Sequence, residues 1–158
     1  SSTAGNGVIE GTYASTAPTD ESRLFWEHLR RAGFVVGDGS ENPFNAVFGK
    51  TGVQTGDGSG ASPAGVLGTA ADTELFTGLM LCTAKLPDKM ALSVDAQMDD
   101  GKGKSGNVRA NIATIDDGKK GKGKGKGSGG GNTSLRQVAD DYVENGVTTY
   151  VVCRQMLL

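Results

Sequence analysis

Three aspartates lie within six residues of one another, where their side chains could bind a metal ion. Asp95, Asp99 and Asp100 fall at the carboxyl end of a segment that reads as a helix. Carboxylates there repel one another, and the helix dipole is unfavourable to negative charge at this end. A calcium ion would relieve the repulsion, although the spacing is not that of an EF-hand loop. The other interpretation is a turn whose charges are neutralised by the basic residues that follow.

A second charged group is a ribbon of glycine and lysine at residues 116–132. Its five lysines are Lys119, Lys120, Lys122, Lys124 and Lys126. Lysines in an unstructured arm can bind DNA or another polyanion weakly and without sequence preference. The ribbon lacks arginine and the interleaved aromatic residues that would stack on bases. An exposed, solvated loop is the favoured interpretation, with a polyanion or an acidic patch on a neighbouring subunit as alternatives.

Charge is unevenly distributed along the chain. Residues 99–126 carry four aspartates, seven lysines and one arginine, a net +4, while the whole chain carries −2. The remainder therefore carries −6. Such a dipolar surface suits head-to-tail association as well as it suits polyanions.

Residue types needed for catalysis are scarce. The single histidine, His28, lies on a predicted helix beside Glu27, and no Gly-x-Ser-x-Gly motif is present. The glycine-rich segments at residues 37–41 and 56–60 lack the sequence features of a phosphate-binding loop, so both read as turns. We therefore expect no enzymatic activity, and no cofactor apart from the calcium considered above.

The two cysteines, Cys82 and Cys153, both lie in apolar runs that are typical of strands. No CxxC pair is present, and one histidine adds little to a metal site. One disulfide bond is favoured over two buried free thiols, and it indicates an oxidising compartment. Closing a loop of that length removes about 4 kcal/mol of unfolded-state entropy on the chain-entropy model.

The elements that position these residues begin with one well-marked helix. After an extended entry segment at residues 1–18, capping residues and a glycine delimit a helix at about residues 20–32. Phe25, Leu29 and Ala32 form one apolar stripe, and Trp26 lies beside it. This pattern is typical of an amphipathic helix.

The remaining chain predicts strands separated by loops and a second helix. Residues 34–73 read as loop with about two short strands, and the very apolar run at 74–82 predicts a central strand. A helix is expected from Pro87, with apolar residues every four positions up to Met98. The other predicted elements are strands at 107–115 and 147–153 and, between them, a short helix or irregular loop at 133–145.

These elements predict one domain, residues 1–158, of the α+β class. We expect an antiparallel sheet with short helices, long glycine-rich loops and one disulfide between Cys82 and Cys153. The ribbon at 116–132 is expected to be one of the exposed loops, because 26 of the 158 residues are glycine. No run of 18 apolar residues occurs, so no membrane span is expected.

Four segments follow one another in a recognisable order. They are NGVIEG at 6–11, ESRLFWEHLRRAG at 21–33, LMLCTAKLPDKMALSVDAQMDDGKGKSGNVRA at 79–110 and YVVCR at 150–154. Together they resemble a subgroup of bacterial type IV pilins and pseudopilin-like proteins. That subgroup has the same aromatic helix, a Leu-Cys before a proline-led helix, Asp-Asp-Gly, a Val-Arg-Ala strand and a last cysteine. The resemblance covers about half of the residues and spans nearly the whole chain.

This resemblance implies a long N-terminal helix that packs on the sheet, and a disulfide, here Cys82 to Cys153, that staples the C-terminal region. It also implies a structural function, because such subunits polymerise through the apolar half of the helix into an extracellular filament or a pseudopilus. The alternative is a secreted minor or tip subunit that serves as an adhesion or polyanion-binding module. Both roles place the protein outside the cell, exported through the periplasm.

The hallmark Phe-Thr-Leu-Ile-Glu segment and its apolar helix do not precede Ser1. Either that helix has been removed from this polypeptide, or it is a separate chain and this one is the globular part of a split pilin. In the second case an apolar sheet face needs a partner in trans. The expected partners are other pilin subunits and, on this second interpretation, a short chain that carries the helix.

Overall fold

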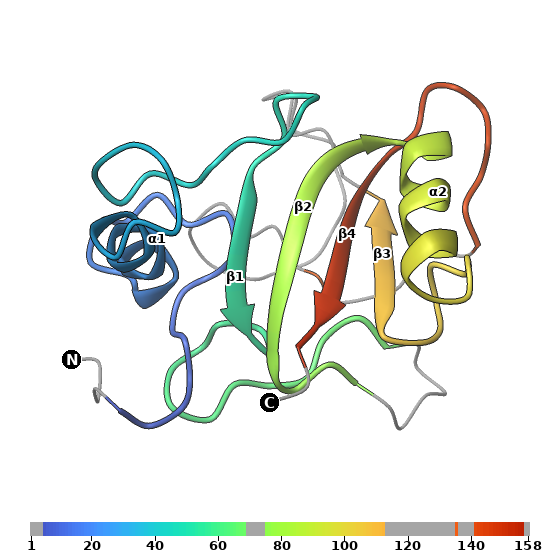
Figure 1. Cartoon of the computed structure of the whole chain (residues 1–158). Helices are drawn as coiled ribbons and strands as arrows, with labels where there is room; N and C mark the ends of the chain where they lie inside the picture. The colour runs from blue at the N-terminus through green and yellow to red at the C-terminus, as the bar shows by residue number, and fades with distance from the viewer. Residues whose placement is uncertain (1–4, 69–74, 113–134, 136–140, 157–158) are drawn as a thin grey trace, which may run out of the picture.

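A computed structural model of the protein describes residues 5–68, 75–112, 135 and 141–156. The described part contains a four-stranded antiparallel sheet, two helices and one disulfide, so the α+β class is confirmed (Figure 1). The elements in chain order are α1 (Glu21–Arg31), β1 (Thr51–Thr55), β2 (Leu79–Pro87), α2 (Asp88–Met98), β3 (Val108–Ile112) and β4 (Thr149–Gln155).

The sheet has the strand order β1-β2-β4-β3, so β2 and β4 lie at its centre. Cys82 on β2 lies directly opposite Cys153 on β4, and the two are joined by the predicted disulfide. The bond therefore ties together the two central strands through cysteines that are 71 positions apart in the sequence. The entry segment runs along the outer edge of β1, where the Thr55 amide donates to the carbonyl of Ile9.

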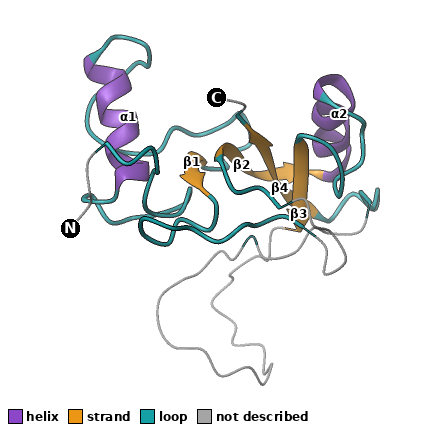
Figure 2. Cartoon of the chain, turned by 90° about the horizontal axis from the view of Figure 1, so that it is seen from below, coloured by secondary structure: helices purple, strands orange, loops and turns teal. Residues whose placement is uncertain are grey.

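Loops close one face of the sheet. Met80, Cys82, Val151 and Cys153 point to this face and belong to one buried cluster. The residues that complete the cluster come from the entry segment and from the loops, namely Tyr13, Val66, Leu67, Phe76 and Leu135. Figure 2 shows both helices on one side of the sheet and a layer of loops on the other.

The second face carries the helices at its two edges. Helix α2 packs on β2, β3 and β4, and helix α1 contacts β1. A second buried cluster lies under α2 and is made of Leu86, Ala91, Val108, Ala110, Tyr150 and Val152. Figure 1 views this face and draws no described helix in front of β2 between α1 and α2.

Strand β1 lies in the segment 34–73, which was expected to be loop with about two short strands, but outside the apolar runs of that segment. The TGVQT sequence of Thr51–Thr55 is weakly apolar, but its last four residues are buried. A Cβ atom on Gly52 would lie 1.9 Å from the carbonyl oxygen of Tyr13, so only glycine lets the entry segment come this close. The strand is therefore defined by contacts with a distant segment, which local periodicity does not reveal.

The other strand predictions are right in type and displaced in position. The strand expected at 74–82 is β2, which begins at Leu79 and continues through a bulge to Pro87. The strand expected at 147–153 is β4, which begins two residues later and ends at Gln155. In the strand expected at 107–115, the described residues 108–112 form β3. The segment 133–145 lies largely outside the described residues, and its described end, 141–145, contains no helix.

The helices are predicted correctly in extent, but their buried faces differ from the apolar stripes. Helix α1 buries Ser22, Arg23 and Trp26, while Ala32 is exposed. Helix α2 buries Asp88, Ala91 and Asp95, and leaves Met90 and Met98 43% and 46% exposed. The charged side chains Arg23, Asp88 and Asp95 can take inner positions because neighbouring segments form hydrogen bonds with them.

Candidate functional site: an open strip on the sheet and the loops that frame it

Strand β2 has one closed face and one partly open face. Met80 and Cys82 are fully buried under the loops, whereas Leu79, Leu81 and Thr83, which point the other way, are only partly buried. We call these three outward residues, with the neighbouring side chains of β1 and β4, the open strip. It lies between α1 and α2 on the sheet face that the helices flank (Figure 2).

The neighbours of Leu81 show how the strip is built. In the sheet register Leu81 lies between Val53 on β1 and Arg154 on β4. Val53 is buried on the α1 side, and Arg154 is exposed on the other. In the next row, Thr83 lies between Thr51 and Val152. The strip is therefore apolar along β2, has small polar residues at one end and carries a cation on β4.

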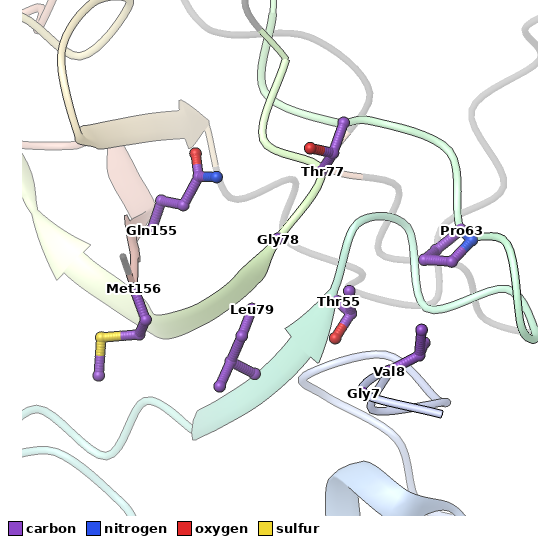
Figure 3. Close-up of a pocket in the computed structure, with 9 residues that line it drawn as sticks. All are labelled: Gly7, Val8, Thr55, Pro63, Thr77, Gly78, Leu79, Gln155 and Met156. Carbon is purple, nitrogen blue, oxygen red and sulfur yellow. The ribbon is translucent and has the colours of Figure 1, made fainter. Parts of the chain in front are cut away.

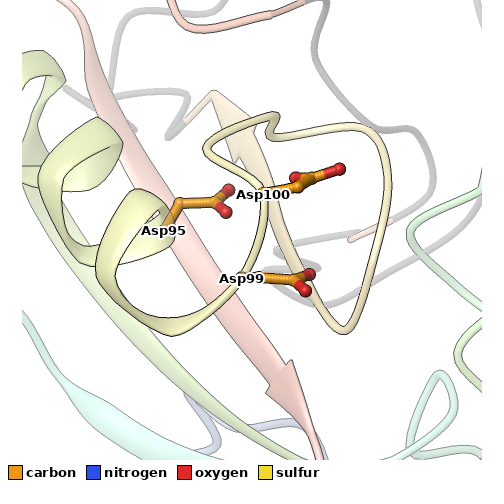
Figure 4. Close-up of side chains that lie close together, drawn as sticks. All are labelled: Asp95, Asp99 and Asp100. Atoms are coloured by element: carbon orange, nitrogen blue, oxygen red, sulfur yellow. The ribbon is translucent and has the colours of Figure 1, made fainter.

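The three aspartates of the sequence analysis are brought together at the end of α2. Their carboxylate oxygens lie within 4.8 Å of one another. Figure 4 shows Asp95 on the last turns of the helix, with Asp99 and Asp100 on the loop that follows it. The structure thus provides a cluster of oxygen atoms of the kind that calcium uses.

Each carboxylate of the cluster also accepts hydrogen bonds from the protein itself. Asp99 Oδ2 accepts from the backbone amides of Asn107 and Val108, at 2.5 and 3.0 Å. Asp100 accepts from the amide of Lys102 and from the hydroxyl of Ser105. These bonds fold the loop between α2 and β3 back on itself. The cluster therefore has a structural role, and calcium binding stays a prediction.

Asp95 is the buried member of the cluster, with an exposed fraction of 0%. Its carboxylate accepts from the Tyr142 hydroxyl at 2.6 Å and from the amide of Gly101 at 3.0 Å. Burial raises the pKa of Asp95, and the negative charges of Asp100 and Asp99 raise it further, outweighing both hydrogen bonds. Burial and the bond to Asp95 also raise the pKa of Tyr142. Asp95 and Tyr142 thus join α2 to the segment that leads into β4.

Asp88, at the other end of α2, is a structural anchor that the sequence analysis did not single out. Its Oδ2 accepts from the backbone amides of Asn145 and Gly146, both at 2.6 Å, and its Oδ1 accepts from the amide of Lys89. These bonds, that of Gly146 first, hold the pKa of Asp88 below its usual range. The feature of the sequence that could have indicated this role is an aspartate in the first turn of a helix, where the helix dipole favours negative charge.

A pocket of about 450 Å³ lies at one end of the sheet, and we call it the end pocket. Thr55 ends β1, Leu79 begins β2 and Gln155 ends β4, so all three lie at this end of the sheet. Figure 3 shows their side chains around it, together with Val8 and Pro63. The other lining residues are Gly7, Thr77, Gly78 and Met156. Nothing in the sequence pattern indicated this pocket, because its lining comes from five separate segments.

The other candidate residues are separated from these features or lie outside the described part. His28 is exposed on α1, as expected for a helix-surface histidine. The segment 56–60 is a turn in which Asp57 accepts from the amides of Ser59 and Ala64, so that prediction is confirmed. The lysines of the ribbon at 116–132 all lie outside the described residues.

Comparisons with protein-family models, with curated proteins and with solved structures find no match to this chain. Among the described residues, no helix is both long and apolar enough to span a membrane.

Proposed function

We propose that this chain is a structural subunit of an extracellular filament of the type IV pilus or pseudopilus kind. The subunit polymerises through a long N-terminal helix, which belongs either to the same polypeptide or to a separate partner chain. In both cases the helix has to pack on the globular part. The proposal therefore requires an apolar surface on this domain that can receive a helix.

The observation that carries the proposal is the open strip on β2. An apolar sheet face is normally covered by a second layer, because its exposure to water is unfavourable. Here Leu79 and Leu81 retain partial exposure, while Met80 and Cys82 on the same strand have none. An α-helix is about 10 Å in diameter, and a helix with an apolar face can form the second layer on such a sheet face.

The surroundings of the strip support the same occupant. Helices α1 and α2 flank it on the same side of the sheet, and a further helix between them would complete a second layer (Figure 2). Arg154, exposed on β4 beside Leu81, supplies a cation that suits an acidic residue on the docked helix. The Cys82–Cys153 disulfide beneath the strip favours an extracellular site of action.

Crosslinking in the cells that produce this protein tests the proposal. A photoreactive phenylalanine analogue replaces Leu81 in the full chain, and the products are identified by mass spectrometry. We expect a crosslink to an apolar, helical segment of a pilin, either in the same polypeptide or in a separate chain. The same analogue at the exposed residue Asp38 is the matched control and should not give this product. Absence of the helical product from position 81 would contradict the proposal.

Immunolabelling of isolated filaments then separates the two structural roles. A major subunit repeats along the filament, whereas an adhesive or DNA-binding minor subunit is labelled only at its tip. Filaments without label along their length or at the tip count against both. The gene segment immediately upstream distinguishes the source of the helix, since an in-frame apolar helix means one polypeptide and a short separate reading frame means a split pilin.

A further inference from the structure

The sheet end at which β1 begins carries a turn with two exposed phenylalanines. Residues 44–49, which we call the phenylalanine turn, are closed by an antiparallel bridge between Phe44 and Lys50. Phe44 is 62% exposed and Phe48 is 80% exposed. Large apolar side chains exposed together in one short segment are typical of interaction surfaces.

Hydrogen bonds fix this turn on the sheet. Asn45 Oδ1 accepts from the backbone amides of Val47 and Gly49, and its Nδ2 donates to Thr83 Oγ1 and to the Ala84 carbonyl. A Cβ atom on Gly49 would lie 1.8 Å from the Ala84 oxygen, so the turn lies directly against β2. The turn is therefore pre-organised, and binding through it costs little ordering entropy.

The backbone at Phe48 is held in an unfavourable conformation. Its φ of 58° lies in the left-handed region, which costs a residue with a bulky side chain about 1–2 kcal/mol. The exposed ring recovers little of this cost by burial within its own chain. Strained residues that persist in a well-bonded setting are concentrated at functional sites. The isolated chain therefore carries the free-energy cost of this backbone conformation while the Phe48 ring is exposed to solvent.

The end pocket lies at the opposite end of the sheet. Thr55, the last residue of β1, lines the pocket, whereas the phenylalanine turn ends one residue, Lys50, before the strand begins at Thr51. Val8, Pro63, Leu79 and Met156 give the pocket an apolar lining (Figure 3). One copy therefore presents protruding aromatic rings at one end and a partly apolar recess at the other.

Basic residues lie next to the phenylalanine turn, and two acidic residues lie close in sequence to the pocket lining, which also neighbours the exposed cation Arg154. Lys50 borders the phenylalanine turn, and Lys85 follows Ala84, the residue to which the turn is bonded. At the pocket end, Asp57 accepts from the amide of Ala64, next to the lining residue Pro63, and Glu10 lies two residues after Val8. Attraction between these lysines and the two acidic residues favours a head-to-tail orientation of a second copy.

We propose that the phenylalanine turn of one copy docks in the end pocket of a second copy of this chain. The contact joins two different surfaces, so it repeats head to tail instead of closing into a dimer. The inference rests on the proposed function, because it names a contact between the globular parts of neighbouring filament subunits. Phe48 is the central residue on one side, and Val8, Pro63 and Met156 form the apolar part of the pocket on the other.

Crosslinking between purified full chains tests this contact directly. A photoreactive phenylalanine analogue at position 48 should give a ladder of dimers and longer products, with the second copy modified at the pocket residues. The matched control carries the analogue at Phe34, which is equally exposed at 80% but lies outside the turn. A ladder from position 34 but not from position 48, or a crosslink from 48 to residues away from the pocket, overturns the proposal.

Two substitutions separate lost contact from lost folding. Phe48→Asn removes the ring and suits the left-handed backbone, so thermal unfolding should be unchanged or slightly improved. Thr77→Trp obstructs the pocket from an exposed position on the other side of the contact. Each should weaken association at least tenfold in sedimentation at low salt, and Phe34→Asn should not. Equal association of wild type and Phe48→Asn overturns the proposal.

The outcomes distinguish this proposal from the proposed function. Filaments that assemble normally with Phe48→Asn and give no crosslink from position 48 leave the filament function standing and remove this contact. A head-to-tail ladder from a chain that is found in no filament retains the contact and removes the filament function. A crosslink from 48 to a separate helical chain contradicts self-association, because it assigns the phenylalanine turn to another partner.

Discussion

The two faces of β2 differ in how far the rest of the chain covers them. Toward the loops, Met80 and Cys82 are fully buried in a cluster that draws on distant parts of the chain. Toward the helices, Leu79 and Leu81 belong to no such cluster and remain partly exposed. Side chains that alternate on one strand are thus divided between a closed face that holds the domain together and a face that, on the proposed function, receives a helix.

This difference means that stability and assembly should respond to different substitutions. Changes on the closed face remove contacts that the isolated chain already makes, so they should unfold it. On the proposed function, changes on the open strip remove contacts that form only in the assembled state, so they should leave the isolated chain folded. A pair of adjacent residues can therefore test the division.

The largest effect is expected from removing the disulfide on the closed face. The double substitution Cys82→Ala and Cys153→Ala should lower the free energy of unfolding by about 4 kcal/mol, because the bond closes a loop with a separation of 71 residues. Chemical denaturation with and without a reducing agent measures this. The reductant should destabilise the wild type and leave the double variant unchanged. Equal stability of the two oxidised proteins would contradict the prediction.

The sharpest comparison is between Met80→Ala and Leu81→Ala. Met80 is 0% exposed, so its truncation should cost about 2–5 kcal/mol through lost burial and a cavity. Truncation of the partly exposed Leu81 should cost about 1 kcal/mol or less in the isolated chain. Urea denaturation of both variants checks the difference.

Filament yield should distinguish the same two variants in a different way from stability. Leu81→Ala should reduce the yield although its chain is folded, whereas the effect of Met80→Ala should follow its loss of folded protein. If Leu81→Ala unfolds the chain as severely as Met80→Ala, or leaves filament yield unchanged, the division between the faces is wrong.

A smaller effect on stability is expected from the titration of the two buried aspartates of α2, Asp88 and Asp95. Bonds from backbone amides lower the pKa of Asp88, so it stabilises the fold above the ordinary value of 3.8 and loses this as pH falls below it. Burial raises the pKa of Asp95, so its ionised form weakens the fold above 3.8, and the fold recovers as pH falls toward that value.

Thermal unfolding of Asp88→Asn and Asp95→Asn between pH 7 and pH 3 tests these opposite signs. The loss relative to wild type should shrink with falling pH for Asp88→Asn and grow for Asp95→Asn. Asp38→Asn, at an exposed position, is the control. Parallel pH profiles for the two buried positions would contradict the assignment.

The predictable parts of this fold were those with strong local signals. The helix at Glu21–Arg31 has an acidic residue in its first turn, basic residues in its last turn and a glycine soon after its end. The proline before α2 and the β-branched run in β4 were equally clear signals. Both cysteines lie in segments that were predicted to be strands, and this was consistent with one disulfide between them. The clustering of Asp95, Asp99 and Asp100 also followed from spacing alone.

The missed parts depend on contacts between distant residues. Strand β1 is weakly apolar and is defined by Tyr13 and by its pairing with β2. The inward faces of α2 carry Asp88 and Asp95 because Gly146 and Tyr142, about 50 residues later, donate hydrogen bonds to them. The end pocket likewise combines separate segments.

The sequence by itself determined the element types, the α+β class and the pairing of Cys82 with Cys153, because helix termini, strand composition and a single cysteine pair are local or combinatorial properties. Only the tertiary structure decided which face of β2 is closed, which helix residues are buried and where the phenylalanine turn lies relative to the end pocket. Those features depend on which distant segments pack together, and burial is a property of that packing.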